Sequence, residues 1–266
     1  MNNQSDKAKK EALKGVYIAG TASGRILYRA SLTKNGRHIS LGSYPTEKKA
    51  HLAYEEASKL LENNSISLND FQVFENLAFE KAVILINYRD NGLYFGTPIY
   101  LRKEYFNYYL DHDRVFTFDL DDLFYFSSHK ITARGGHYFV ADYGSQVSIG
   151  SRFGLKPYSV VGRDCRFINS DPFDYRRENL EITNTYHGVI PSPDGKGYIA
   201  RLHTSGYTKI GTYDSALEAA IAYNKALDIV KKRPGAKNFP ENYIDEVSGK
   251  VYAEIYNSVS INLGIK

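Results

Sequence analysis

The chain has 266 residues and a formal net charge of +4, and its 42% hydrophobic and 14% aromatic content is typical of folded domains and excludes an intrinsically disordered chain. Its single cysteine excludes an intramolecular disulfide, and no apolar run is long enough to cross a membrane. The first ten residues are polar and lack the apolar segment of a secretory signal peptide, so we expect a cytoplasmic protein.

The first patterned region has the features of a small sheet followed by a helix. Residues 28–33 alternate between apolar and polar side chains, which predicts a half-buried strand, and Asn35-Gly36 predicts a hairpin turn. Residues 37–44 continue as a second strand, and apolar side chains recur at helical spacing over residues 50–61. We therefore expect a three-stranded sheet covered by one helix over residues 14–63.

The middle of the chain differs from this region in charge and composition. Residues 63–185 hold thirteen basic and sixteen acidic residues. Tyrosine and phenylalanine are frequent over residues 94–143, which predicts a β-rich segment, and residues 82–86 are predicted as the buried part of a strand or a helix. Because the net charge there is negative, we interpret the aromatic residues as core rather than as a surface that stacks on single-stranded bases.

A region near the C-terminus repeats the pattern of the first region. The order Tyr-x-Ala-x-Leu, then Leu/Ile-Gly-x-Tyr, then Ala-x-x-Ala-Tyr-x-x-Ala occurs from Tyr28 to Ala57 and again from Tyr198 to Ala226. Two copies this far apart predict two similar modules on one chain rather than a stacked solenoid. The second module is expected over residues 186–240.

Both modules are basic, and both are expected to leave one sheet face open. Residues 12–62 and residues 186–240 each hold eight basic and four acidic residues. A basic module with hydrogen-bond donors on an open sheet has the electrostatic character of a nucleic-acid-binding domain, and the alternative is a solvated sheet face. The open faces are expected to carry Tyr17, Arg29, Ser31, Thr33, His38 and Ser40 in the first module and Ile190, Ile199, Arg201, His203, Tyr207 and Lys209 in the second.

The repeated pattern, together with Gly15-Val16 and Gly188-Val189, resembles the DNA-binding domain of the Apetala-2/ethylene-response-factor family. The resemblance implies that each sheet lies in the major groove of double-stranded DNA. The chain has no Trp, and most of the family's groove-reading Arg and Trp residues are absent, so no base preference is implied. The implied contact residues are Lys14, Tyr17, Arg29, Ser31, Thr33, His38 and Ser40 in the first module and His187, Ile190, Arg201, His203, Tyr207 and Lys209 in the second.

A second resemblance lies between the modules. Residues 168–180 read Ile-Asn-Ser-Asp-Pro-Phe-Asp-Tyr-Arg-Arg-Glu-Asn-Leu and resemble the ββα-metal motif of HNH homing endonucleases. That motif needs a carboxylate for a divalent cation and a His as general base, and this chain has Arg166 and Phe167 at those positions. A further family His is replaced by Ser151, whereas Asn179 is retained. The resemblance implies a nuclease fold that has lost its catalytic site, with no metal and no cofactor.

These observations predict an α+β protein in which two modules, each a three-stranded antiparallel sheet plus a helix, flank a degenerate ββα (HNH-like) domain. The expected function is sequence-specific binding of double-stranded DNA by a transcriptional regulator, most simply a repressor, of a phage, mobile element or bacterial host. One alternative is an active HNH-type homing or nicking endonuclease with a rearranged metal site. Another is a DNA-bound adaptor that recruits a protein, or a second copy of the chain, through the acidic middle. The expected parts are an N-terminal arm (1–13), the first module (14–63), a connecting β-rich aromatic region (64–114), the HNH-like domain (115–185), the second module (186–240) and a C-terminal segment (241–266).

Overall fold

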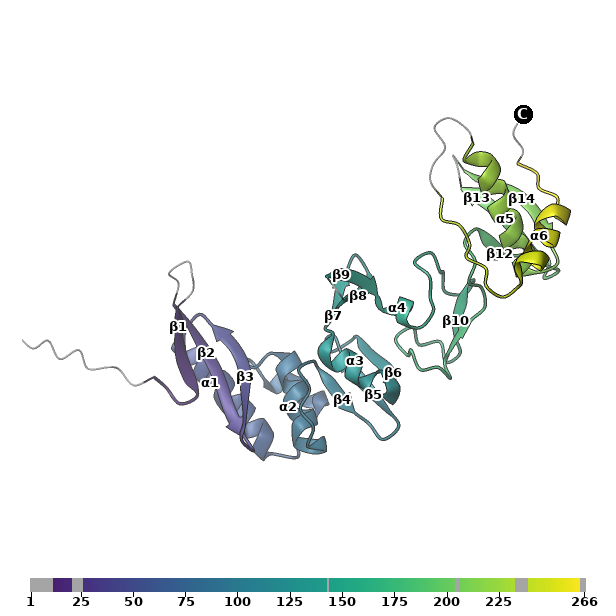
Figure 1. Cartoon of the computed structure of the whole chain (residues 1–266). Coiled ribbons are helices and arrows are strands. Elements are labelled where there is room, and N and C mark those ends of the chain that lie inside the picture. The colour runs from purple at the N-terminus through teal and green to yellow at the C-terminus, as the bar shows by residue number, and fades with distance from the viewer. Residues whose placement is uncertain (1–11, 21–25, 143, 204–205, 233–238, 264–266) are drawn as a thin grey trace, which may run out of the picture. The chain divides into compact units, whose positions relative to one another are not determined.

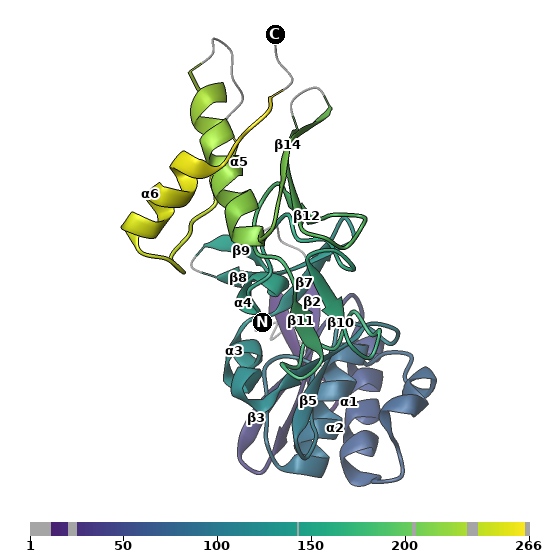
Figure 2. The same ribbon diagram turned by 90° about the vertical axis from the view of Figure 1, so that its right-hand side faces the viewer.

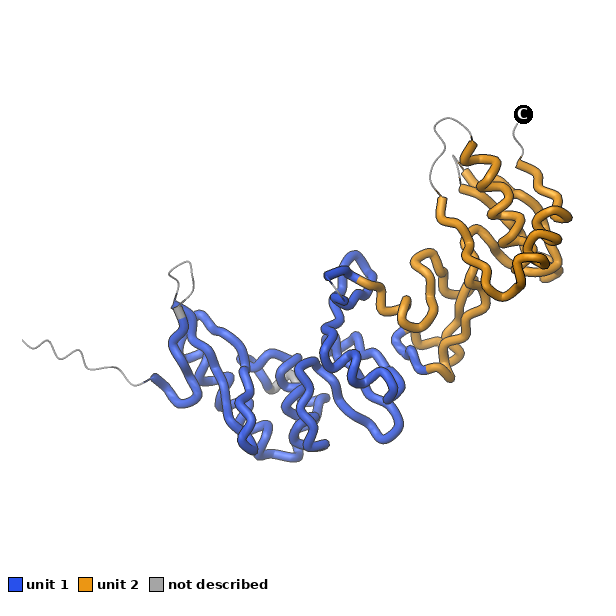
Figure 3. The backbone as a smooth tube through the Cα atoms, in the orientation of Figure 1, with its two compact units in different colours: residues 1–146, 173–176 blue, residues 147–172, 177–266 orange. Residues whose placement is uncertain are grey.

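The computed structural model describes residues 12–20, 26–142, 144–203, 206–232 and 239–263. The chain divides into two compact units (Figure 3), and each unit is described by itself below. The described residues form helices and small antiparallel sheets, so the fold is of the α+β type, as predicted. The predicted N-terminal arm lies outside the described residues apart from Ala12 and Leu13. The first unit comprises Met1–Gln146 and Phe173–Arg176, and the second comprises Val147–Pro172 and Arg177–Lys266.

The first sheet has the three strands expected from the sequence. Its order is β1-β2-β3, with β1 at Val16–Gly20, β2 at Ile26–Lys34 and β3 at Arg37–Tyr44. Asn35 and Gly36 join β2 to β3 with φ values of 51° and 74°. Positive φ at both central residues is what a tight hairpin turn requires, and Asn and Gly adopt it at low cost.

Helix α1 covers one face of this sheet (Figure 1) and runs over Glu47–Glu62. The Thr46 side chain caps its N-terminus by accepting a hydrogen bond from the Lys49 backbone N–H at 3.3 Å. Small side chains on the inner face allow the helix backbone to approach the strands closely. The fully buried alanines are Ala50, Ala53 and Ala57.

The second module repeats this arrangement in the second unit. Strands β12 (Val189–Pro191), β13 (Tyr198–His203) and β14 (Tyr207–Tyr213) form a sheet in that order. Helix α5 covers one face of the sheet over Ala216–Val230, and Ser215 caps its N-terminus. The two regions therefore have the same order of elements as well as a similar sequence.

Both sheets share an irregularity at the same point of the repeat. The register of β2 and β3 skips Leu41, and the register of β13 and β14 skips Ile210. Such a β-bulge adds one residue to one strand and increases the local twist. Since Leu41 and Ile210 are equivalent in the repeat, the two modules share this detail of their backbone geometry.

Helix α2 (Phe79–Asn91) extends the core of the first module. Residues 82–86, which the sequence left open between strand and helix, lie in this helix and are all buried. The Arg89 guanidinium donates hydrogen bonds to the carbonyl oxygens of Leu60 (3.0 Å) and Asn63 (2.8 Å), at the C-terminal end of α1. A short 3-10 helix, η1, precedes α2 at Leu68–Val73.

The middle of the chain is rich in strands and has an aromatic core, as predicted. Strands β4 (Ile99–Leu101), β5 (Tyr105–Tyr109) and β6 (Val115–Asp119) form one sheet. Its buried aromatic side chains belong to Phe106, Tyr108, Phe116, Phe118 and, from the following helix, Phe126. The elements that follow are η2 (Leu120–Asp122), α3 (Leu123–Ser128), β7 (Ile131–Arg134), β8 (His137–Asp142), β9 (Ser145–Ser148) and α4 (Ile149–Arg152).

The segment that resembles the nuclease motif forms two strands without the helix of a ββα unit. Strand β10 (Cys165–Phe167) pairs with β11 (Leu180–Ile182). Residues 183–188 contain no helix, and β12 follows directly. The backbone N–H groups of Thr183 and Asn184 donate to the carbonyl oxygen of Asp164, which is distant in sequence.

The C-terminal segment belongs to the second module. Helix α6 (Gly249–Ser258) lies along α5 in both views of the molecule (Figures 1 and 2). The Tyr256 hydroxyl donates to a carboxylate oxygen of Asp228 in α5 at 2.8 Å. Beyond the helix, the Asn262 N–H donates to the carbonyl oxygen of Ile210 at 2.8 Å. The segment thus supports the side of the module that faces away from the open sheet face.

Candidate nucleic-acid interface

Among the described residues, the open face of the first sheet carries one arginine. Arg29 in β2 lies between Tyr17 of β1 and Ser43 of β3. Ser31 alternates onto the same face but is only 7% exposed, because its short side chain lies in the central strand between two neighbours. Its hydroxyl is therefore not presented to the solvent as the sequence suggested. The predicted residues that are exposed are Tyr17, Arg29, Thr33, His38 and Ser40.

The open face of the second sheet carries a cluster of cationic and aromatic side chains. Arg201 is opposite Lys209 across β13 and β14, and His203 is opposite Tyr207. The Arg201 guanidinium lies over the Tyr207 ring, 4.0 Å from its centroid, and the His203 ring meets the same ring edge-on at 4.7 Å. Contact with an aromatic face orients the guanidinium without neutralising its charge. Within the described part of the chain, neither Arg201 nor Lys209 forms an ion pair.

The two faces place their cations at different positions of the repeat. Arg201 and Lys209 of the second module occupy the positions of Ser31 and Ser40 in the first. The position of Arg29 is taken by an isoleucine in the second module. The first sheet therefore has hydroxyl groups where the second has cations, and the second face is the stronger candidate for contact with an anionic ligand.

Two residues implied by the family resemblance lie away from the open faces. Lys14 lies beside α1, and its Nζ is 5.8 Å from the centroid of the Tyr54 ring. His187 is packed between the rings of Tyr158 (centroid distance 4.5 Å) and Tyr223 (5.5 Å). Its Nδ1 is buried and has no hydrogen-bond partner within the described residues, and burial lowers the pKa of this imidazole. The structure thus places His187 in the support of the sheet rather than on its exposed surface.

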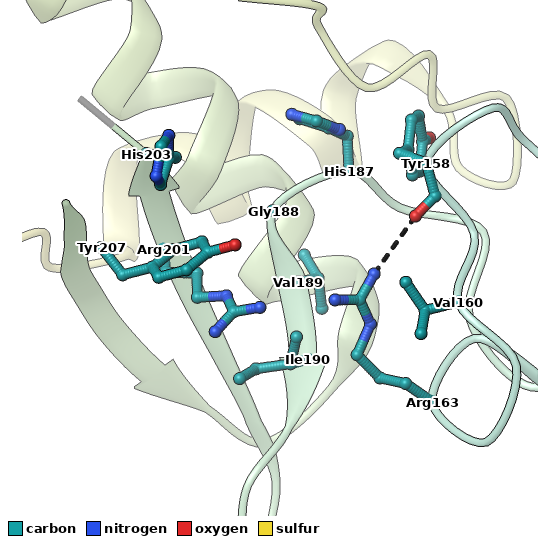
Figure 4. Close-up of a pocket in the computed structure, with 10 residues that line it drawn as sticks. All are labelled: Tyr158, Val160, Arg163, His187, Gly188, Val189, Ile190, Arg201, His203 and Tyr207. Atoms are coloured by element: carbon teal, nitrogen blue, oxygen red, sulfur yellow. Dashed lines mark hydrogen bonds between the residues drawn. The ribbon is translucent and has the colours of Figure 1, made fainter. Parts of the chain in front are cut away.

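A loop that precedes the second module forms a wall beside its open face (Figure 4). Tyr158, Val160 and Arg163 of this loop lie across a pocket from Ile190 of β12 and Arg201 of β13, and the pocket has a volume of about 240 Å³. The two guanidinium groups lie on opposite sides of the pocket. Sequence reasoning missed the loop because it lies outside the repeat and only the fold brings it to the sheet.

A buried carboxylate holds this loop in place. Asp164 is 1% exposed and accepts hydrogen bonds from the Arg163 guanidinium, from the Val160 N–H (2.8 Å) and from the Asn184 amide (2.8 Å). The same Asn184 amide donates to the carbonyl oxygen of Val189 in β12 at 2.8 Å. Burial raises the pKa of Asp164, but these hydrogen bonds and the positive charge of Arg163 more than offset that effect, so its pKa lies below the ordinary value.

The positions at which the sequence departs from the nuclease motif that it resembles have structural contacts. Arg166 forms an ion pair with Glu181 across β10 and β11 at 2.7 Å, and Phe167 is buried. The Asn179 side chain accepts a hydrogen bond from the Asn169 N–H at 2.8 Å, which fixes the loop between the two strands. Ser151 lies exposed in α4. Across the described ranges, no group of three or more His, Cys, Asp or Glu side chains is arranged to hold a metal ion.

Three comparisons with known proteins were made. A scan against protein-family models, a search of curated proteins and a search of solved structures found no match to this chain. Among the described helices, none is both long and apolar enough to cross a lipid bilayer. The residues and geometry of the two sheet faces are therefore the basis for assigning a role.

Proposed function

We propose that the chain is a sequence-specific double-stranded DNA-binding protein that acts as a transcriptional regulator, most simply a repressor that occupies a promoter. In this proposal the open sheet faces of the two modules contact the major groove. The second module supplies most of the charged contacts, through Arg201 and Lys209. We also propose that the chain derives from an HNH homing endonuclease and that it binds DNA without cutting it.

The observation that carries the proposal is the open face of the second sheet. Arg201 and Lys209 form no salt bridge within the described residues, although Asp194 is near enough to Lys209 to interact with its charge, and they lie opposite each other on adjacent strands. Unpaired cations on a surface are the groups that neutralise phosphates and release their counterions. The guanidinium of Arg201 can in addition donate two hydrogen bonds to a guanine edge.

The size of the sheet also supports the proposal. Adjacent strands lie about 4.8 Å apart, so the backbone of a three-stranded sheet is about 10 Å wide. The major groove of B-form DNA is about 12 Å wide and is entered by helices and narrow β-structures. Because α5 and α6 occupy the other side, no helix covers the open face of the second sheet, and the loop of Tyr158, Val160 and Arg163 lies beside it.

The chemistry of the former nuclease positions supports binding without cleavage. A guanidinium stays protonated and cannot ligate a cation, and Arg166 is committed to an ion pair with Glu181. Phe167 offers no lone pair that could accept a proton from water. Asn179 is used to hold the loop between the two strands. We therefore expect the protein to leave its bound DNA intact in the presence of Mg²⁺.

The test is the affinity for a fluorescently labelled random-sequence duplex, measured by anisotropy over a range of salt concentrations. With about six to ten phosphate contacts, affinity should fall by about 10³ to 10⁵ between about 50 and 200 mM salt. Lys209→Gln should weaken binding and reduce the slope of the logarithmic salt dependence by about one. Lys250→Gln is the matched control, because this lysine is 86% exposed on α6, away from the sheet face.

Two results would contradict the proposal. One is an affinity that does not change with salt. The other is an equal effect of Lys209→Gln and Lys250→Gln, which would show that net charge rather than the sheet face determines binding. Cleavage of the labelled duplex in the presence of Mg²⁺ would instead favour the nuclease alternative.

A further inference from the structure

The pocket beside the second sheet has a cationic and aromatic lining. Arg163 and Arg201 contribute guanidinium groups, His187 and His203 contribute imidazoles, and Tyr158 contributes a phenol ring. None of the lining residues is acidic. This composition fits a ligand that combines a negative charge with a flat or apolar part.

Hydrogen bonds fix the Arg163 side chain in position on the loop side of the pocket. Its Nε lies 2.9 Å from both carboxylate oxygens of Asp164, and its Nη2 also donates to the Tyr158 carbonyl oxygen at 3.3 Å. Its Nη1 makes no hydrogen bond within the described residues, so it remains available to a ligand. A side chain that is already ordered loses little conformational entropy when a ligand binds.

The charge of the pocket matches a single phosphodiester. The buried carboxylate of Asp164 balances the charge of Arg163, whereas no carboxylate of the described residues balances the charge of Arg201. Burial and the charge of Arg163 lower the pKa of His187, so this imidazole is neutral at neutral pH. The two guanidinium groups therefore leave about one net positive charge, which a phosphodiester with one negative charge would neutralise.

The volume exceeds what a phosphate group alone would fill. At about 240 Å³, the pocket also has room for a sugar or a base, and Tyr158, Val160 and Ile190 give it an aromatic and apolar lining for such a group. We propose that this pocket binds one nucleoside phosphate of a DNA strand, with its phosphate on Nη1 of Arg163, while Arg201 at the edge of the pocket stays directed to the base edge that the proposed function assigns to it. This inference rests on the proposed function, because the pocket shares Arg201, His203 and Tyr207 with the sheet face.

Under this proposal the second module has a phosphate-binding pocket that the first module lacks. The loop that carries Arg163 lies before the second module and outside the repeat, and the position of Arg201 is a buried serine, Ser31, in the first. The pocket would add a fixed backbone contact at the margin of the second sheet. Such contacts set the register of a protein on a duplex, while base contacts give the specificity.

The experiment compares two adjacent substitutions in the loop. Val160 lines the pocket and is 48% exposed, whereas its neighbour Val161 is 59% exposed and does not line it. Val160→Glu would place a carboxylate against the phosphate and should weaken binding of the random-sequence duplex about tenfold or more relative to Val161→Glu. Both changes leave Asp164 with its hydrogen bonds, since the loop donates to it through the backbone of Val160.

A second variant and a second ligand complete the test. Arg163→Gln should weaken duplex binding and reduce the slope of the salt dependence by about one, with thermal melting measured alongside to confirm folding. Suppose that Lys209→Gln weakens duplex binding, whereas Val160→Glu and Val161→Glu bind the duplex equally well. That result would overturn the pocket proposal and leave the proposed function standing. In a third outcome, deoxyadenosine monophosphate binds the wild type but not Val160→Glu, and the two proteins have equal affinity for the duplex. That result would assign the pocket to free nucleotides instead. Loss of salt-dependent duplex binding in the wild type would overturn both.

Discussion

The glycine that opens each repeat touches the tyrosine that lies in its helix. Gly15 and Gly188 have φ values of 76° and 73°. A Cβ atom would lie 2.1 Å from the Tyr54 ring at Gly15 and 2.3 Å from the Tyr223 ring at Gly188. Both the backbone conformation and the close approach of the ring therefore require glycine. The glycine of the Gly-Val part of the repeated pattern contacts the tyrosine of the Ala-x-x-Ala-Tyr part, so this contact links the two parts.

This contact predicts a large difference between two glycine substitutions in the second module. Gly188→Ala should destabilise it by about 2–5 kcal/mol, from positive φ and from a clash with the Tyr223 ring. Gly195→Ala is the matched control, since Gly195 has a φ of 70° but no atom within 4 Å of the added Cβ, and it should cost about 1 kcal/mol. Hydrogen exchange of the α5 amides in the full chain measures the loss of stability in each of the two variants. Equal protection in the two variants would show that the ring contact is unimportant.

The Asp164 carboxylate predicts a dependence of stability on pH. Its pKa is lower in the folded chain than in the unfolded chain, so its contribution is present above the unfolded value of about 4 and is lost as pH falls through the folded value. At neutral pH, Asp164→Asn should therefore cost about 2 kcal/mol, because charged hydrogen bonds to Arg163 and Val160 are weakened.

The measurement is denaturant unfolding of wild type and variant between neutral and acidic pH. The difference in free energy of unfolding should shrink as pH falls below about 4. Asp113→Asn is the control, since that carboxylate is 95% exposed, and it should leave stability unchanged at all pH values. A constant difference for Asp164→Asn across the pH range would show that the amide disturbs packing rather than a charge interaction.

At the scale of elements, local pattern predicted the modules well. The strand expected at residues 37–44 is observed with the same bounds, and Thr46, a residue type typical of helix starts, caps α1. Alternation and capping are local signals, so they can be read without knowledge of the rest of the chain. Residues 82–86 could not be assigned, because a helix segment buried on every side has no apolar and polar faces to distinguish it from a buried strand.

Long-range contacts account for what the sequence did not reveal about the candidate site. Alternation placed Arg201 and Lys209 on the open face correctly, but it could not show that Ser31 is covered or that His187 packs between two rings. The loop of Arg163 reaches the sheet through the Asp164 and Asn184 network, which joins residues distant in sequence. No helix follows β11 over residues 183–188, where the N–H groups of Thr183 and Asn184 bond to Asp164, so the expected ββα arrangement is not confirmed.

At the scale of the whole molecule, the chain combines two modules of one fold with unequal charge on their open faces. The second has Arg201 and Lys209 where the first has serines, and it has the additional wall of the Arg163 loop. If both sheets enter the major groove, one chain reads two half-sites and the second module dominates the affinity. Substitution of Arg201 should then have a larger effect on specificity than substitution of Arg29.

The central claim is that the chain reads the sequence of double-stranded DNA through these faces, and selection from a random duplex library tests it most directly. After several rounds, the wild type should enrich a defined sequence. Arg201→Gln should relax the preference at one position, with a loss of about 1–3 kcal/mol in discrimination if the guanidinium contacts a base pair, and Arg29→Gln should relax it less. A library that stays random after selection with the wild type, or a sequence that Arg201→Gln enriches equally well, would contradict the claim.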